Sequence, residues 1–73
     1  MTKAEYIISE LEKYKQTHVD WAEYFEQHPD IEKEYLATGE WDTAKEHRRI
    51  ASVYDDTINY INKTSYLLDK LSL

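Results

Sequence analysis

The sequence predicts an all-α fold of two long helices joined by a short helical elbow. The chain of 73 residues holds one glycine and one proline, too few for the frequent turns of an all-β domain. Apolar residues make up 41% of it and aromatic residues 14%, enough for a folded core despite a net charge of −6. Apolar residues also recur at alternating spacings of three and four, the period of a helix. We therefore expect a single helical domain over residues 1–73.

The first predicted helix covers about residues 3–27. It begins at a capping box, in which the Thr2 hydroxyl caps the Glu5 amide and the Glu5 side chain reaches back. Apolar and aromatic side chains then follow at heptad spacing, and we expect them to form a seam flanked by Ile8 and Ala22. The seam residues are Ala4, Ile7, Leu11, Tyr14, His18, Trp21, Phe25 and His28.

The second predicted helix is the short elbow, over about residues 29–37. His28-Pro29 ends the first helix, because a residue before proline avoids the α region whereas proline suits the first turn of a new helix. Gly39 is the natural C-terminal stop of the elbow. Its apolar residues, Ile31, Tyr35 and Leu36, would add a thin third wall to the seam.

The third predicted helix covers about residues 43–71 and is capped by Asp42 or Thr43, the latter in a second capping box with Glu46. Its apolar stripe consists of His47, Ile50, Ala51, Tyr54, Ile58, Ile61, Leu68 and Leu71. Two long helices share only one seam. The sequence therefore leaves two arrangements open, a small three-helix bundle and a dimer that forms a four-helix arrangement.

Negative charge is concentrated in residues 20–42. This segment holds eight carboxylates against Lys33 alone, a net charge of −7, whereas residues 1–19 carry no net charge and residues 43–73 carry +1. Like charges at i, i+4 destabilise a helix slightly, so local stability does not explain them. Carboxylates several ångströms apart on a rigid helical surface imitate phosphates, which recur about every 3.4 Å along one DNA strand. Tryptophan and tyrosine are frequent interface anchors, and the segment offers Trp21, Tyr24, Tyr35 and Trp41.

We therefore predict that this segment binds a basic protein partner. The alternative interpretation is an ordinary solvated helix face that keeps the protein soluble. The predicted partner-binding residues are Asp20, Glu23, Tyr24, Glu26, Asp30, Glu34, Trp41 and Asp42.

The sequence contains no catalytic or metal-binding motif. No pair among His18, His28 and His47 has the i, i+3 or i, i+4 spacing that presents two imidazoles to a metal, and we expect His18 and His47 to meet as packed core histidines. Asp55 and Asp56 are adjacent on a helix and point in different directions, so we expect solvated side chains. A glycine-rich phosphate loop and a nucleophile motif are also missing. We expect neither an enzyme nor a cofactor.

Lys45, Arg48 and Arg49 form a small basic cluster at the start of the third helix. We expect these side chains to pair with acids of the elbow rather than with nucleic acid, because phosphate would repel the acidic molecule as a whole. No apolar run approaches the about 20 residues of a membrane span or the apolar block of a signal peptide. We therefore expect no membrane partner and a cytoplasmic location.

In its size, helicity, lack of cysteine and concentrated acidity, the sequence resembles small acidic helical proteins encoded by bacteriophages and mobile elements. The resemblance implies a DNA mimic in the host cytoplasm, which inhibits a sliding clamp, repressor or nuclease by occupying its DNA-binding surface. Residues Lys70-Leu71-Ser72-Leu73 partly resemble the motif by which bacterial proteins dock on the replicative sliding clamp, without its glutamine and terminal phenylalanine. The alternative function is that of a structural or regulatory homodimer, which interacts through apolar helix faces.

Overall fold

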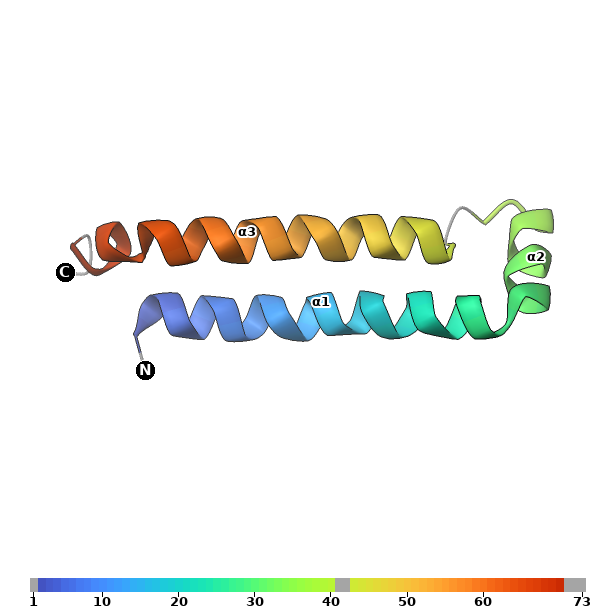
Figure 1. The fold of residues 1–73 in the computed structure, drawn as a ribbon, viewed down its shortest axis with the longest axis horizontal. Helices are drawn as coiled ribbons and strands as arrows, with labels where there is room; N and C mark the ends of the chain where they lie inside the picture. Colours follow the sequence, from blue (N-terminus) through green and yellow to red (C-terminus); the bar gives the residue numbers. More distant parts are fainter. Residues whose placement is uncertain (1, 41–42, 71–73) are drawn as a thin grey trace.

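The computed structural model describes residues 2–40 and 43–70 and contains three helices there, α1 (Lys3–Gln27), α2 (Pro29–Ala37) and α3 (Ala44–Lys70). The long helices α1 and α3 lie side by side and antiparallel, and α2 lies across one end of the pair (Figure 1). The body measures 51 × 18 × 17 Å. The predicted fold class, two long helices joined by a helical elbow, is confirmed.

Threonine side chains cap both long helices. The Thr2 hydroxyl accepts from the Glu5 backbone amide at 3.1 Å and donates to the Glu5 carboxylate at 3.3 Å. At the start of α3, the Thr43 hydroxyl accepts from the Glu46 amide at 3.3 Å. The Glu46 side chain binds Arg49 instead of reaching back, so the second predicted capping box is only half formed. Position 71, the predicted last residue of the third helix, lies outside the described residues.

The elbow follows its two sequence signals. Pro29 opens α2, and His28 before it has left the helical region, with φ −131° and ψ 64°. At the other end Gly39 has a φ of +90°, in the left-handed region. The Glu40 amide donates to the Tyr35 carbonyl at 3.0 Å, and the Gly39 amide donates to the Leu36 carbonyl at 3.2 Å. This pair of bonds is a Schellman motif, which ends the helix and satisfies its last carbonyls.

The core is small and lies mainly where the elbow meets the long helices. Phe25 is the largest fully buried side chain among the described residues, and it packs with Ala22 and Ala44. Ile31 of α2 covers this cluster from the end. Along the rest of the seam the buried residues are Ala4, His47, Ala51 and Ile58. Alanines at the seam let α1 and α3 approach closely, which leaves little room for large side chains between them.

The predicted seam of α1 is rotated in the structure. Ile7, Tyr14 and Trp21 were expected inside, but 38%, 54% and 43% of their surfaces remain exposed. Ala22, expected only as a flank, is fully buried. A pair of closely packed helices accommodates a methyl group more easily than an indole ring, so the large side chains lie along one edge of the seam.

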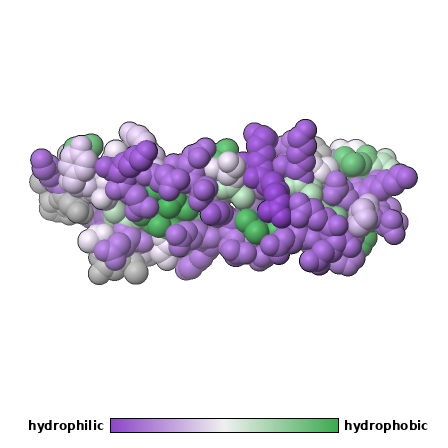
Figure 2. Space-filling model, viewed as in Figure 1, coloured by the Kyte–Doolittle hydropathy of each residue, from purple (hydrophilic) through white to green (hydrophobic). Residues whose placement is uncertain are grey.

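The face of the molecule drawn in Figure 2 is mostly hydrophilic. On the face drawn in Figure 2, hydrophobic residues gather in patches along the line between the long helices, and hydrophilic residues cover much of the rest. Across residues 2–40 and 43–70, no helix combines the length and the apolar character that crossing a membrane requires.

Candidate partner-binding site

The predicted acidic residues lie together at one end of the molecule. Asp20, Glu23 and Glu26 occupy the last two turns of α1, and Asp30 and Glu34 lie on α2, which crosses that end (Figure 1). All five side chains are exposed. We call this region, residues 20–40, the elbow end. The predicted site residues Trp41 and Asp42 lie outside the described residues.

Helix electrostatics account for some of these charges and disfavour others. Asp30 is in the first turn of α2, where the positive end of the helix dipole stabilises a carboxylate. Glu34 is in the last turn of α2, at the negative end of the dipole, and that turn has no basic residue. Within the described parts of the chain, neither Glu23 nor Glu34 forms an ion pair. The charge of Glu23 nevertheless acts on Arg48 of α3, whereas the local structure does not explain Glu34.

Glu26 differs, because Arg48 of α3 neutralises it. The guanidinium donates two hydrogen bonds to the carboxylate, from Nε to Oε2 at 2.9 Å and from Nη2 to Oε1 at 2.7 Å. These bonds, together with the positive charge, lower the pKa of Glu26 below its ordinary value and raise the pKa of Arg48. Both side chains stay about half exposed. The predicted pairing of the basic cluster with the acidic segment is thus confirmed for Arg48.

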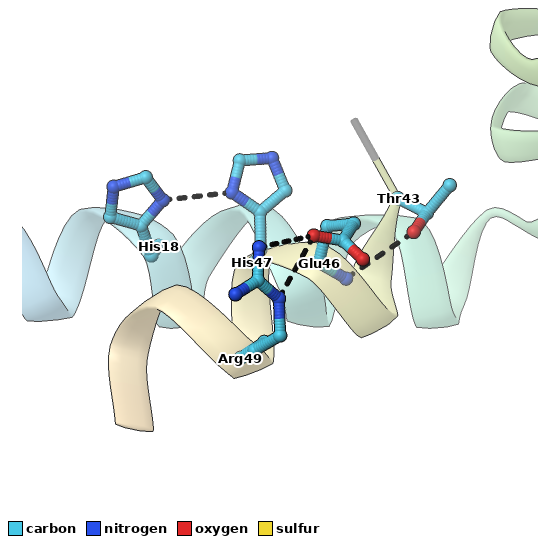
Figure 3. A network of polar contacts seen from close by, with 5 residues as sticks. All are labelled: His18, Thr43, Glu46, His47 and Arg49. Atoms are coloured by element: carbon cyan, nitrogen blue, oxygen red, sulfur yellow. Dashed lines mark hydrogen bonds and ion pairs between the residues drawn. The ribbon is translucent and has the colours of Figure 1, made fainter. Parts of the chain in front are cut away.

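Arg49 forms a different pair. Its Nε and Nη2 atoms donate to Glu46, one turn earlier in α3, at 3.1 and 2.9 Å (Figure 3). The expectation that Arg49 pairs with an acid of the elbow is therefore wrong. The reason is geometric, since residues three apart on a helix are neighbours.

A shallow groove of about 420 Å³ opens beside Asp20 of α1. The residues that line it are Thr17, Asp20, Trp21, Tyr24 and Tyr35. Trp21 and Tyr24 meet edge to face, with 5.9 Å between ring centroids. The Asp20 carboxylate accepts a hydrogen bond from the side-chain amide Nε2 of Gln16 at 2.9 Å. This bond restrains the carboxylate at the groove. A carboxylate next to electron-rich ring faces suits a lysine or arginine side chain.

An aromatic network supports the groove from the core side. Trp21 stacks on Phe25 at 5.7 Å and on His47 at 6.0 Å, and Phe25 meets Tyr35 edge to face at 5.4 Å. Behind these rings, Nδ1 of His18 lies 2.9 Å from Nδ1 of His47 (Figure 3), which confirms the predicted meeting of the two histidines. One of these nitrogens donates and the other accepts. Rings from all three helices thus hold the groove in shape.

The groove brings together part of the predicted site. Asp20 and Tyr24 were predicted as binding residues, and Trp21 and Tyr35 as aromatic anchors. Thr17 was missed, although the spacing 17, 20, 21 and 24 puts these four residues on one face of α1. The predicted residues Glu23, Glu26, Asp30 and Glu34 lie outside the groove lining.

Other kinds of site have little support among the described residues. Residues 2–40 and 43–70 contain no group of three or more His, Asp or Glu side chains that could hold a metal ion. The fold and the site define an antiparallel helical hairpin with an acidic, aromatic end. Comparison with known proteins gave no match to a family model, a curated protein or a solved structure.

Proposed function

We propose that the protein is an acidic DNA mimic. It binds the positively charged DNA-binding surface of a DNA-handling protein, such as a sliding clamp, a repressor or a nuclease, and excludes DNA. The observation that carries the proposal is the elbow end, where exposed carboxylates of two helices adjoin a groove lined by Asp20 and three aromatic rings.

The carboxylates supply the electrostatic part of binding. Asp20, Glu23 and Glu26 follow one another at a rise of about 4.5 Å along α1, comparable to the about 3.4 Å between phosphates along one DNA strand. α2 extends the charged surface across the end of the hairpin with Asp30 and Glu34. Because Arg48 already pairs with Glu26, most of the uncompensated charge comes from the other four residues.

The groove supplies the anchor. An arginine or lysine of the partner enters between Trp21 and Tyr24, and its charge meets the Asp20 carboxylate. Tightly packed aromatic residues are typical binding hot spots, whereas exposed charges mainly accelerate association. DNA is then excluded by competition for the same basic surface. The proposal implies a non-enzymatic protein that works in the bacterial cytoplasm, encoded by a phage or a mobile element.

The test begins with a pull-down from bacterial lysate, in which the tagged protein is eluted in steps of rising salt and the eluted proteins are identified by mass spectrometry. We expect a DNA-binding protein to elute at moderate salt, because screening weakens contacts between exposed charges. Recovery of a partner that survives high salt, or of no basic protein, would contradict the proposal.

Two matched variants then locate the binding surface. Glu23→Lys with Glu34→Lys reverses two unpaired charges of the elbow end, and Glu12→Lys with Asp56→Lys makes the same change of net charge elsewhere. We expect the elbow variant to lose about tenfold or more in affinity for the captured protein and to stop displacing DNA from it. The control variant should keep most of its affinity for the captured protein and most of its ability to displace DNA. Equal behaviour of the two folded variants would show that net charge alone acts, and the proposed site would be wrong.

A further inference from the structure

The two edges of the seam between α1 and α3 differ in chemistry. One edge carries the interhelical ion pairs, Lys15 with Asp55 at 2.8 Å and Glu26 with Arg48 at 2.7 Å. On the other edge Tyr14 stacks on Tyr54, with 6.2 Å between ring centroids. We call this second edge the aromatic side. Its residues are Ile7, Tyr14 and Trp21 of α1 and Ile50, Tyr54 and Ile61 of α3.

The aromatic side is apolar but incompletely covered. Ile7, Tyr14 and Trp21 leave 38%, 54% and 43% of their surfaces exposed, and the three residues of α3 are partly buried. Four of the six buried hydrophobic residues in the described structure are alanines. The hairpin therefore leaves much of its large apolar surface outside its own core, and burial of that surface would stabilise the fold.

We propose that a second copy of the chain covers the aromatic side, antiparallel to the first, to form a homodimeric four-helix bundle. The proposal does not depend on the proposed DNA mimicry. It concerns the edge of the seam between the long helices, and this edge meets the groove of the elbow end at Trp21, which belongs to both surfaces.

The spacing of the three α1 residues fits this symmetry. Ile7 and Trp21 each lie seven residues from Tyr14, and Tyr14 is close to the middle of α1. A two-fold axis through Tyr14 sets the two Tyr14 side chains against each other and each Ile7 opposite Trp21 of the second copy. A closed dimer requires such a self-complementary surface. A seven-residue repeat also keeps an apolar stripe facing its neighbour in a supercoiled bundle.

Charge selects the antiparallel arrangement over the parallel one. Residues 20–42 carry a net charge of −7, whereas residues 1–19 carry no net charge and residues 43–73 carry +1, so the opposite end of the hairpin is close to neutral. Antiparallel packing separates the two elbow ends and places each beside the nearly neutral end of the other copy. Parallel packing would bring the two elbow ends together, where like charges repel.

The whole side of the hairpin that includes the aromatic side is comparable in area to a standard interface. One side of a body that is 51 Å long and 18 Å wide has an area of roughly 900 Å², compared with about 800 Å² per partner in a standard interface. The dimer would display one elbow end at each end of the bundle.

The first experiment measures the mass in solution by sedimentation equilibrium. We expect twice the chain mass of 8.8 kDa for the native protein and the chain mass for Tyr14→Glu. Tyr60→Glu is the matched control, since Tyr60 is 68% exposed and does not belong to the aromatic side, and it should stay dimeric. Far-UV circular dichroism checks that each variant is helical. A native protein that remains monomeric at its highest soluble concentration, or a folded Tyr14→Glu variant that remains dimeric, overturns the proposal.

The second experiment uses the absence of cysteine from the chain to test the orientation. We expect a mixture of Ile7→Cys and Trp21→Cys proteins to form disulfide-linked dimers of the two variants under mild oxidation. Ile7→Cys alone should link poorly, because antiparallel packing keeps the two Ile7 positions apart. Tyr14→Cys alone should form disulfide-linked dimers. This variant tests whether the aromatic side is the interface while Trp21 stays in place. Efficient linking of Ile7→Cys alone would show a parallel dimer and overturn the proposed arrangement.

Discussion

The two ends of the hairpin are built from the same pair of helices but bury very different side chains. At the elbow end, Phe25 is only 1% exposed, with Ala22 and Ile31 packed around it. At the opposite end, where α1 starts and α3 finishes, Tyr6 is 59% exposed and Tyr66 is 57% exposed. Each end offers aromatic residues, so composition does not account for the contrast.

The difference is the third helix. α2 crosses the elbow end and packs against the seam there (Figure 1), whereas among the described residues the far end has only α1 and α3. Two helices in contact bury a single stripe each, and large side chains become fully buried only where another element covers them. The elbow thus has two roles in this fold, since it completes the core and carries part of the acidic surface.

The largest effect is expected from Phe25→Ala. Removing a fully buried phenylalanine ring costs about 3–5 kcal/mol, through lost burial and the cavity that remains. That cost is a large fraction of the stability of a small domain, so we expect much or all of the variant to be unfolded at room temperature. Urea denaturation followed by far-UV circular dichroism, at a fixed protein concentration, measures the change.

The matched substitution at the other end is Tyr66→Ala. Because Tyr66 is more than half exposed, we expect a change in the free energy of unfolding within about 0.5 kcal/mol. Similar losses in the free energy of unfolding for Phe25→Ala and Tyr66→Ala would mean that the elbow end does not hold the main core.

A smaller effect is expected at Gly39, which takes part in the Schellman motif that ends α2. A Cβ atom at this position would meet nothing within 4 Å, so the cost of Gly39→Ala comes from its φ of +90°, which L residues avoid by about 1–2 kcal/mol. Gly39→Asn should lose less, because asparagine tolerates the left-handed region. Thermal unfolding of the three proteins tests the order Gly, Asn, Ala. A fully stable alanine variant would indicate that the Schellman motif does not fix the elbow.

The helices could be predicted from the sequence because their boundaries depend on local chemistry. Thr2 with Glu5, His28-Pro29 and Gly39 each act within a few residues. The rotation of α1 about its axis could not be predicted in the same way. Whether Trp21 or Ala22 faces α3 depends on how closely two distant segments pack, and the heptad pattern admits both.

The candidate site likewise has features that the sequence predicts and features that depend on packing between distant segments. The concentration of acidic residues in one segment is visible from composition, and the break between α1 and α2 at His28 was enough to place both acidic sets at one end. The Glu26–Arg48 pair joins residues 22 positions apart. It depends on the antiparallel register of α1 and α3, which no local signal specifies. The groove likewise needs α2 to bring Tyr35 next to Trp21.

The smallest expected effect is the pH dependence of the Glu26–Arg48 pair, which ties α1 to α3 near the elbow end. Arg48 lowers the pKa of Glu26 in the folded state below its ordinary value of 4.5, so the pair stabilises the fold when the carboxylate is ionised. This contribution is fully present above pH 4.5 and is lost as the pH falls through the lowered pKa. Both side chains are exposed, which keeps the effect small and sensitive to salt.

Glu26→Gln removes the titration and keeps the shape of the side chain. We expect the native protein to be the more stable of the two near neutral pH, and the difference in free energy of unfolding to shrink as the solution is acidified below the ordinary pKa of glutamate. Urea denaturation at a series of pH values, in low and in high salt, measures this difference. A difference that stays constant across the series would mean that the pair acts through hydrogen bonding alone, since glutamine can still accept from Arg48. In that case the charge of Glu26 would contribute nothing to joining α1 and α3.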